Sequence, residues 1–410
     1  MTPDSGAVRR TLKLQVLVNT VGNGMYMTAG VLYFLRVTGL SAAQVGAGLS
    51  VAGLVALSAG VPVGHLADRR GARRVYAATL VASGLGMASF LLVHGFWQFL
   101  AVACLCGLAQ NAGAAARGPI VRAYGGERPQ RFRAQLRVVT NIGISAGAVL
   151  AGAVVQADTR TAYVLLIAGN AVSFLAAAAM TLAVPPPAPV PPGPAGPSWT
   201  AALRDRPFVL VAALDGMMSI QFRVVTVLFP LWAVTHTAAP RWIVGAGMLA
   251  NTALVVACQV RAGRGVDSPS AASAAMRRAG LAFVLACGVF AGAQGTPGWA
   301  AALLLLAGMT VHTLGELWHS AAGFELSYAL APDHATGQYL GLWGMGMGLG
   351  GAFAPALLTT LCVSWGRPGW AVVGALLLFT GLLSPAATRW AVRTRPRAGT
   401  ETSAGAVAGG

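Results

Sequence analysis

The chain has 410 residues, of which 56% are hydrophobic and only 10% are charged. A soluble domain carries about 25% charged residues, so this composition excludes a soluble enzyme or binding domain and indicates an integral membrane protein. The net charge of +17 would suit a nucleic-acid partner, but the positions of the charges argue against one.

A helix that spans a bilayer needs about 20 mainly apolar residues, and the chain divides into twelve such segments. We expect them at 14–36, 42–63, 75–93, 97–121, 135–156, 161–183, 208–232, 242–261, 279–295, 299–328, 337–362 and 369–388. A proline-rich stretch from Pro185 to Pro197 cannot be helical, and it separates the segments six and six. The sequence therefore predicts an all-α membrane protein. Its parts would be an N-terminal six-helix bundle (1–184), a cytoplasmic linker (185–206), a C-terminal six-helix bundle (207–393) and a disordered cytoplasmic tail (394–410).

Basic residues gather on one side of this arrangement. Most of the 28 lysines and arginines lie near the N-terminus or in clusters at 69–74, 122–137, 204–206, 261–278 and 389–397. Connections on the cytoplasmic side carry such an excess. The pattern places both termini in the cytoplasm and the chain in the cell (inner) membrane as a multi-pass protein. It also accounts for the positive charge without a nucleic-acid partner.

The connection between the second and third segments is unusually polar. Residues 64–74 include four arginines and one aspartate, a cluster that cannot lie in hydrocarbon. We expect a tight polar turn at the cytoplasmic face, where Gly64 and Gly71 allow close backbone approach. Asp68 could pair with an arginine or with the positive N-terminal end of a neighbouring helix. The simplest alternative is a basic loop that only sets the topology.

The spacing G-x-L-A-D-R-x-G-x-R-R in this connection resembles the signature between helices 2 and 3 of the major facilitator superfamily of secondary transporters. The matching positions are Gly64, Leu66, Ala67, Asp68, Arg69, Gly71, Arg73 and Arg74. In that family the loop is thought to act as a conformational latch between the two halves. The resemblance therefore implies a latch role for Asp68, Arg69 and Arg73. Arg117 lies in the cytoplasmic third of the fourth segment, where its side chain could snorkel or pair with Asp68.

Polar residues within the segments are unevenly distributed, and the first segment of each group of three is the most polar. Because polar groups in lipid are costly, these side chains should face a cavity or one another. In the transporter family the corresponding helices line a central cavity. The candidate cavity residues are Asn19, Asn23, Tyr26, Gln110, Asn111, Gln221, Phe222, Arg223, Glu316 and His319.

The tenth segment carries His312, Glu316 and His319, which share one helical face. Such a set could relay protons, because burial raises the pKa of a carboxylate and histidine titrates near neutrality. A metal site is a rival interpretation, but the spacing is not H-E-x-x-H and no cysteine joins the set. The third possibility is a polar cluster that only holds helices together. We expect no metal and no cofactor.

The seventh segment carries Asp215 and Arg223, which could serve as a proton carrier and as the counter-charge for an anionic group, or could simply balance charge. The sequence departs from the pattern of drug–proton antiporters in the family. Ala148 stands where their fifth helix usually has proline, Arg117 comes too late for their helix-4 arginine, and helix 1 has no acid. Any coupling should therefore run through Asp215, Glu316, His312 or His319.

The resemblance implies a secondary transporter that rocks two lobes around a central site. Our first expectation is proton-coupled efflux of a small, fairly apolar organic molecule by a monomeric antiporter, with protons and membrane lipids as its other partners. Uptake or facilitated diffusion of a polar or anionic metabolite is the alternative. A membrane enzyme acting on lipid, or a receptor without transport, are alternatives of other classes. Against an enzyme, no nucleophile stands at a suggestive spacing from the buried acids and histidines. The sequence does not identify the substrate.

Overall fold

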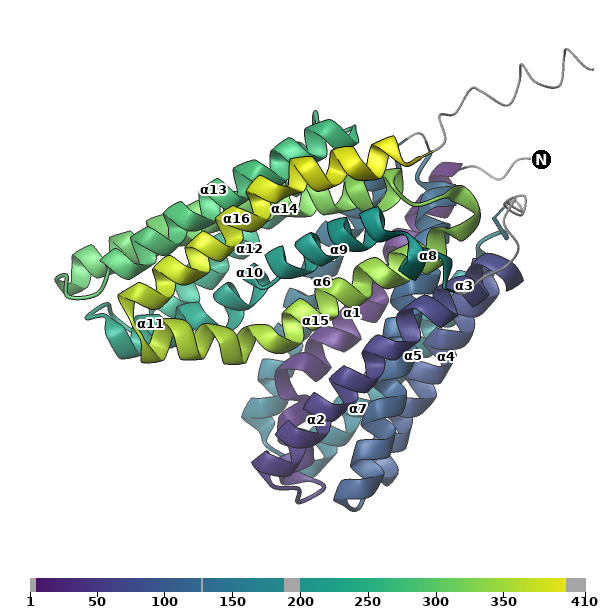
Figure 1. The fold of residues 1–410 in the computed structure, drawn as a ribbon. Coiled ribbons are helices and arrows are strands. Elements are labelled where there is room, and N and C mark those ends of the chain that lie inside the picture. Colours follow the sequence, from purple (N-terminus) through teal and green to yellow (C-terminus); the bar gives the residue numbers. More distant parts are fainter. Residues whose placement is uncertain (1–4, 127, 188–199, 396–410) are drawn as a thin grey trace, which may run out of the picture.

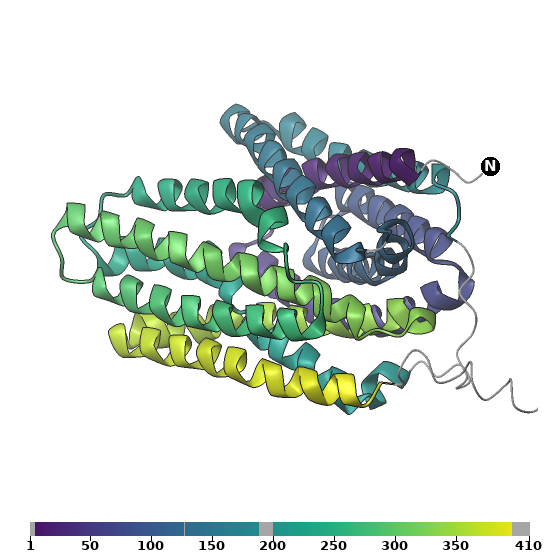
Figure 2. The same cartoon turned by 90° about the horizontal axis from the view of Figure 1, so that it is seen from above.

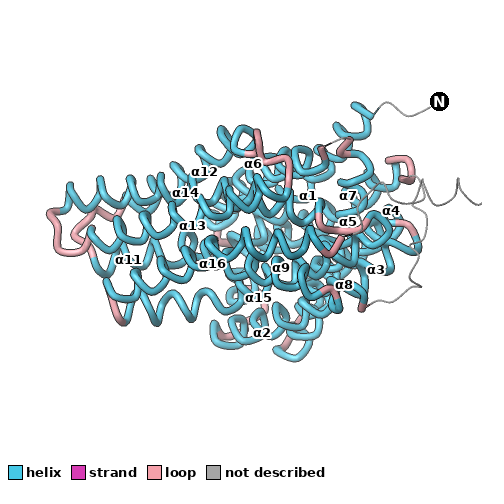
Figure 3. The backbone as a smooth tube through the Cα atoms, turned by 45° about the horizontal axis from the view of Figure 1, so that its top comes forward, coloured by secondary structure: helices cyan, strands magenta, loops and turns pink. Residues whose placement is uncertain are grey.

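The computed structural model describes residues 5–126, 128–187 and 200–395, and these residues form helices without any strand (Figure 3). The longer helices are α1 (Ser5–Arg36), α2 (Ala42–Ala56), α3 (Gly60–Arg70), α4 (Ala72–Ser89), α5 (Phe96–Tyr124), α6 (Pro129–Ala157), α7 (Arg160–Ala183), α9 (Arg206–Met218), α12 (Ile243–Ala262), α13 (Pro269–Gly292), α14 (Gly298–Ala329), α15 (Thr336–Leu358) and α16 (Arg367–Arg393). The shorter elements are η1 (Leu57–Ala59), η2 (Phe90–Leu92), α8 (Ala201–Arg204), α10 (Gln221–Arg223), η3 (Val224–Leu228), α11 (Phe229–His236), η4 (Asp333–Ala335) and η5 (Thr359–Ser364).

Eleven segments of the described chain are long and apolar enough to cross a membrane, from Gln44–Arg70 to Arg367–Arg393. Helix α1 has 32 residues but is more polar, since Gln15, Asn19 and Asn23 lie along it. It packs along α6 and α7 inside the first half of the molecule, and it completes the twelve helices that the sequence predicts. Most of the predicted linker and tail, residues 188–199 and 396–410, lies outside the described residues.

The helices form two bundles, each with its own hydrophobic core. The first half buries Phe34 of α1, Phe90 of η2 and Phe99 of α5, and the second half buries Trp232 of α11 and Phe290 of α13. Figure 1 shows the bundles meeting at the end of the molecule that carries the N-terminus and diverging from there. Figure 2 shows from above how the helices of the second bundle extend side by side away from that end. We call the meeting end the closed end.

The polar turn predicted for residues 64–74 is narrower in the structure. Helix α3 continues through Arg70, and the chain turns at Gly71, whose φ of 92° lies in the left-handed region that glycine adopts readily. Gly64 therefore does not bend the chain, but it does meet another backbone closely. Asp68 lies in the last turn of α3, two residues before its end, and its position on the helix decides where its carboxylate points.

The seventh predicted segment is not one continuous α-helix. It consists of α9, a break at Ser219 and Ile220, α10, the π-helical turn η3 and α11. Pro230 explains part of the irregularity, because proline lacks an amide hydrogen and cannot complete the α-helical ladder. Helix α15 likewise contains Pro355 and passes into the π-helical turn η5. Such π turns inside helices are often found at functional sites.

Candidate functional site

Helices α3 and α15 touch backbone to backbone at the closed end. A Cβ atom added to Gly64 would lie 2.2 Å from the carbonyl oxygen of Gly337, and one added to Gly60 would lie 2.9 Å from that of Gly341. In each helix the two glycines are four residues apart, so successive turns are in contact. Any larger side chain would have to push the bundles apart.

The carboxylate of Asp68 caps the start of α15. It accepts hydrogen bonds from the backbone N–H groups of Gly337 at 2.8 Å and Gln338 at 3.0 Å. The first N–H groups of a helix point away from its own carbonyl oxygens, and the helix dipole also favours negative charge at this end. The sequence allowed either an arginine or a helix N-terminus as the partner of Asp68. In the structure its partner is the helix N-terminus.

The other proposed latch residues lie elsewhere. Arg73 donates to the carbonyl oxygens of Leu182 at 3.1 Å and Val184 at 2.8 Å, so it closes the C-terminal end of α7 within its own bundle. Arg69 is exposed. Among the described residues Arg117 forms no ion pair with Asp68. Of the proposed set, Gly64 and Asp68 are therefore the residues that reach the second bundle.

We expect Asp68→Asn to slow transport several-fold without loss of the protein from the membrane. The amide cannot carry the negative charge that the α15 N-terminus favours, an interaction worth about 0.3–2 kcal/mol. The measurement is the transport rate at equal membrane abundance. Asp333→Asn is the control, because its side chain is exposed and its ion pair with Arg122 contributes about 0–1 kcal/mol. A rate equal to that of the unmodified protein for Asp68→Asn would contradict this role.

Arg122 joins α5 to the region between α14 and α15. Its guanidinium donates to the carbonyl oxygens of Tyr328 at 2.6 Å and Ala331 at 3.1 Å, and its Nη1 lies 2.9 Å from Asp333. It also donates to the Thr336 hydroxyl at 2.6 Å. The sequence alone indicates only a topology-setting charge for Arg122, because its partners lie more than 200 residues away along the chain.

Arg137 and Glu316 form a buried ion pair between α6 and α14. Nη2 of Arg137 lies 2.5 Å from Oε1 of Glu316, and the two side chains are 20% and 7% exposed. The second carboxylate oxygen accepts from Nδ2 of Asn251 on α12 at 2.9 Å. Arg137 also donates to the hydroxyl of Ser320. Each carboxylate oxygen of Glu316 thus accepts a hydrogen bond, and a buried charge needs such partners to offset its loss of hydration.

Neither Arg137 nor Asn251 is among the sequence-predicted site residues. Arg137 lies two residues inside the predicted fifth segment, but it also belongs to the basic cluster at 122–137 that indicates a cytoplasmic connection. Asn251 lies in the middle of the predicted eighth segment. A charged or amide side chain inside a span predicts a buried partner, and this signal was present for both residues.

Arg133 lies one helical turn from Arg137, nearer the closed end. It donates to the Ser327 hydroxyl at 2.7 Å, and its guanidinium lies 5.0 Å from the centre of the Phe324 ring and 5.5 Å from that of Tyr328. Arg137 lies 5.1 Å from the Phe222 ring centre. Both arginines therefore stack on aromatic rings of the second bundle.

Asp215 and His319 form a second buried pair, this time within the second bundle. Nε2 of His319 lies 3.1 Å from Oδ1 of Asp215, and Gln221 lies 3.4 Å from Nδ1 of the same ring. Phe222 packs beside His319, with ring centres 5.6 Å apart. The residues Asp215, Gln221, Phe222 and His319, predicted from two separate segments, are thus brought together.

His312 does not join either pair. Its ring packs against Phe283 at 5.1 Å and Phe290 at 6.4 Å between centres, and both its nitrogens are buried without a hydrogen-bond partner. The three residues predicted to share one face thus have different contact partners: Glu316 meets Arg137, His319 meets Asp215, and the ring of His312 packs against α13 while remaining within electrostatic reach of Glu316. No cluster in the described chain has the residues to hold a metal ion.

The remaining cavity candidates are less closely connected. Asn23 donates to the side chain of Asn19 at 3.3 Å, and Tyr26 stacks on Phe90 within the first bundle. Gln110 is exposed, whereas Asn111 is half-buried. Nε of Arg223 lies 3.4 Å from the carbonyl oxygen of Gly351. That oxygen lacks its usual helical donor because residue 355 is proline, so this contact gives Arg223 a local structural partner.

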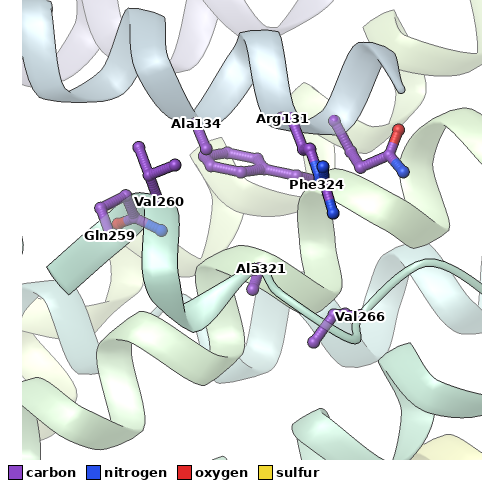
Figure 4. Close-up of a pocket in the computed structure, with 9 residues that line it drawn as sticks. Arg131, Ala134, Gln259, Val260, Val266, Ala321 and Phe324 are labelled. Carbon is purple, nitrogen blue, oxygen red and sulfur yellow. The ribbon is translucent and has the colours of Figure 1, made fainter. Parts of the chain in front are cut away.

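A small pocket lies between α6 and the second bundle near the closed end (Figure 4). Gln259, Ala134 and Phe324 line it, and its volume is about 10 Å³, room for no more than a water molecule. The amide of Gln259 is buried there without a protein partner. This pocket is too small to hold an organic substrate.

Comparison with known proteins agrees with this architecture. The family model of the Major Facilitator Superfamily matches residues 14–322, whereas no curated protein matches the chain. Solved structures match over nearly the whole length. A bacterial homologue of the iron transporter ferroportin in an outward-facing state has a TM-score of 0.73 at 14% identity, covering 94% of this chain and 99% of that chain. The human organic anion transporter MFSD10 has a TM-score of 0.68 at 14% identity, covering 93% and 100%. A mutant of the nucleoside transporter NupG has a TM-score of 0.56 at 15% identity, covering 94% and 99%. At these identities the structures show a shared fold, and the family match shows more: this chain is a member of the major facilitator superfamily of transporters.

Proposed function

We propose that the protein exports a small organic molecule across the cell membrane in exchange for protons, and that Glu316 is the proton carrier. The ion pair between Glu316 and Arg137 is the observation that carries the proposal. It is buried, it can be broken by adding one proton, and it joins the two bundles whose relative motion is transport. The proposed activity is transport without catalysis. The proposed working unit is a monomer.

The positive charges support a cytoplasmic position for the closed end. Arg9 donates to the carbonyl oxygen of Tyr124, at the helix end that also carries Arg122. Arg128 pairs with Asp267 across the interface, and Arg395, just after α16, pairs with Asp205, which also binds Tyr339 of α15. The excess of arginine favours the cytoplasm. In this proposal the conformation is closed toward the cytoplasm, and both termini are cytoplasmic.

Protonation of Glu316 would remove the charge that compensates Arg137. A buried ion pair that loses one partner leaves the other charge unpaired, at a cost of about 3–5 kcal/mol. Opening the cytoplasmic end relieves this cost, because water then reaches Arg137. A proton taken up from outside therefore favours opening inward, and its release to the cytoplasm favours closing again.

The groups around Glu316 permit this switching. Arg137 faces it from α6 and Asn251 from α12, while Thr313 and Ser320 lie on its own helix. Asp215 and His319 are paired with each other. Among the described residues, Arg137 is therefore the charged group that forms an ion pair with Glu316, and His312, one turn away on α14, is a titratable group close enough to interact with its charge. Adding one proton to Glu316 has its largest effect on the contact with Arg137.

Glu316→Gln tests the proposal. In an efflux-deficient bacterial host, we expect the unmodified protein to protect against some compounds of a toxicity panel. Glu316→Gln should lose that protection, because glutamine cannot release a proton and re-form the ion pair. Glu325→Gln is the matched control, since Glu325 is another buried glutamate on α14. Export should also stop when a proton uncoupler is added.

Protection by both the unmodified protein and Glu316→Gln would remove Glu316 from the coupling path. The Asp215–His319 pair would then be the second candidate, because it is also buried and can also bind a proton. Asp215→Asn tests it in the same assay. If the unmodified protein gives no protection, or sensitises the host, export is wrong and uptake of a polar metabolite becomes the function to measure.

A further inference from the structure

The arginines that reach across the closed end differ in how their charge is balanced. Arg122 pairs with Asp333, Arg128 with Asp267 and Arg137 with Glu316. In the described chain Arg133 forms no ion pair with a carboxylate, although it lies beside Ser327 and two aromatic rings. Of these four arginines, Arg133 is therefore the one whose guanidinium has no carboxylate in direct contact among the described residues.

Arg133 and Arg137 are four residues apart on α6, so their side chains lie on the same face of the helix. That face is turned toward α14, where Arg137 contacts Glu316 and Arg133 contacts Ser327. Both partners leave when α14 moves away from α6. The first bundle then presents two unpaired guanidinium groups toward the space that opens.

We propose that Arg133 and Arg137 bind the anionic group of the transported molecule, and that Glu316 takes the place of this group when the closed end is closed. This inference rests on the proposed function, because it specifies the substrate class of the same transporter. The substrate would be an organic anion with a flat apolar body. Arg137 alternates between two anionic partners, the substrate and Glu316.

Three features support an anion of this kind. A guanidinium presents donors in a fork that suits carboxylate and phosphate groups. The two arginines are stacked on the rings of Phe222, Phe324 and Tyr328, and such rings can also pack on an aromatic ligand. The carboxylate of Glu316 already shows that the position beside Arg137 accepts an anion, at 2.5 Å.

The exchange also explains how closure would release the substrate. In the inward-open state the anion binds to Arg137 and Arg133. When Glu316 has lost its proton and the bundles close, its carboxylate competes for Arg137 at a high local concentration. The substrate is displaced from the arginine and can leave to the outside.

Binding to the purified full-length chain tests the inference without a membrane or a gradient. The probe is radiolabelled 1-naphthoate, measured by equilibrium dialysis, and its neutral match is 1-naphthamide. We expect Glu316→Gln to bind 1-naphthoate at least tenfold more tightly than the unmodified protein, because the competing carboxylate is gone. Adding Arg137→Gln should abolish this gain, and adding Arg133→Gln should reduce it several-fold. Adding Arg128→Gln, in an exposed ion pair, should leave it unchanged.

Several results would overturn the inference. They are equal binding of 1-naphthoate and 1-naphthamide, a Glu316→Gln affinity no higher than that of the unmodified protein, or a gain that survives Arg137→Gln. Competition with 1-naphthoate by inorganic phosphate and by 1-naphthyl phosphate tests the anionic group and the aromatic body of the ligand separately. Stronger competition by the naphthyl compound supports the aromatic site, whereas equal competition contradicts it.

Arg137→Lys guards against a misfolded variant, because it keeps the charge and should keep part of the 1-naphthoate binding. The outcome is also separable from that of the proposed function. Arg137-dependent binding together with uncoupler-insensitive transport would contradict proton coupling and leave the anion site standing. Proton-coupled export together with 1-naphthoate binding that does not depend on Arg137 would support the proposed function and contradict the anion site.

Discussion

Arg137→Glu is expected to abolish transport, and the exchange of both charges, Arg137→Glu with Glu316→Arg, is expected to restore a measurable part of it. The single change places a second carboxylate where the guanidinium of Arg137 now lies 2.5 Å from Glu316. Losing the partner of a buried charge costs about 3–5 kcal/mol, and about 1.4 kcal/mol changes an equilibrium tenfold. The closed end should therefore be populated at least a hundredfold less.

The measurement is substrate accumulation in everted membrane vesicles, together with the melting temperature of the purified variants. The control is Arg128→Glu with and without Asp267→Arg. Arg128 and Asp267 also join the bundles, but they lie 3.7 Å apart and are about half exposed, so this pair is worth about 0–1 kcal/mol. A transport rate for Arg137→Glu equal to that of the unmodified protein would show that the pair has no part in closure.

Gly64→Val is expected to trap the protein with its closed end open. The new Cβ would lie 2.2 Å from the carbonyl oxygen of Gly337. Because that neighbour is backbone, α3 and α15 must separate, and the hydrogen bonds of Asp68 to α15 are then lost as well. Transport should fall to background, because one of the two alternating states is no longer reached.

Maleimide labelling can detect this trapped state. Ser327 is fully buried at the interface beside Arg133, so Ser327→Cys should be protected in the unmodified protein and labelled in Gly64→Val. The background chain would have its five cysteines replaced. Gly46→Val is the control, because nothing lies within 4 Å of a Cβ at Gly46. A protected Ser327→Cys in Gly64→Val would show that the interface tolerates the larger residue.

Much of the fold could be predicted from the order of residues. The apolar segments, their number and their division around the proline-rich stretch depend on local composition, because lipid requires each span to satisfy its own backbone hydrogen bonds. Eleven spans meet the criteria of length and apolarity in the structure, and α1 is the more polar twelfth. The local details differed: the turn at residues 64–74 is confined to Gly71, and the seventh segment is interrupted at Ser219 and Ile220 and contains a π-helical turn just before Pro230.

The candidate site was predicted in part. The buried acids and histidines of α9 and α14 were found from their cost in lipid, and the structure pairs Asp215 with His319. The sequence could not show that Glu316 meets an arginine 179 residues away. It also could not separate His312 from Glu316, because a shared helical face does not say which neighbouring helix covers each residue.

The sequence by itself determined that the chain is a two-bundle membrane transporter of a known family, since composition, span lengths and the motif around Asp68 are all local properties. Only the tertiary structure decided which charges lie between the bundles. Arg122, Arg133 and Arg137 look like ordinary topology-setting residues in the sequence. Their role at the interface depends on how α5 and α6 pack against α14 and α15. That packing is set by contacts such as Gly64 with Gly337, whose members are distant in the chain and are brought together only by the fold.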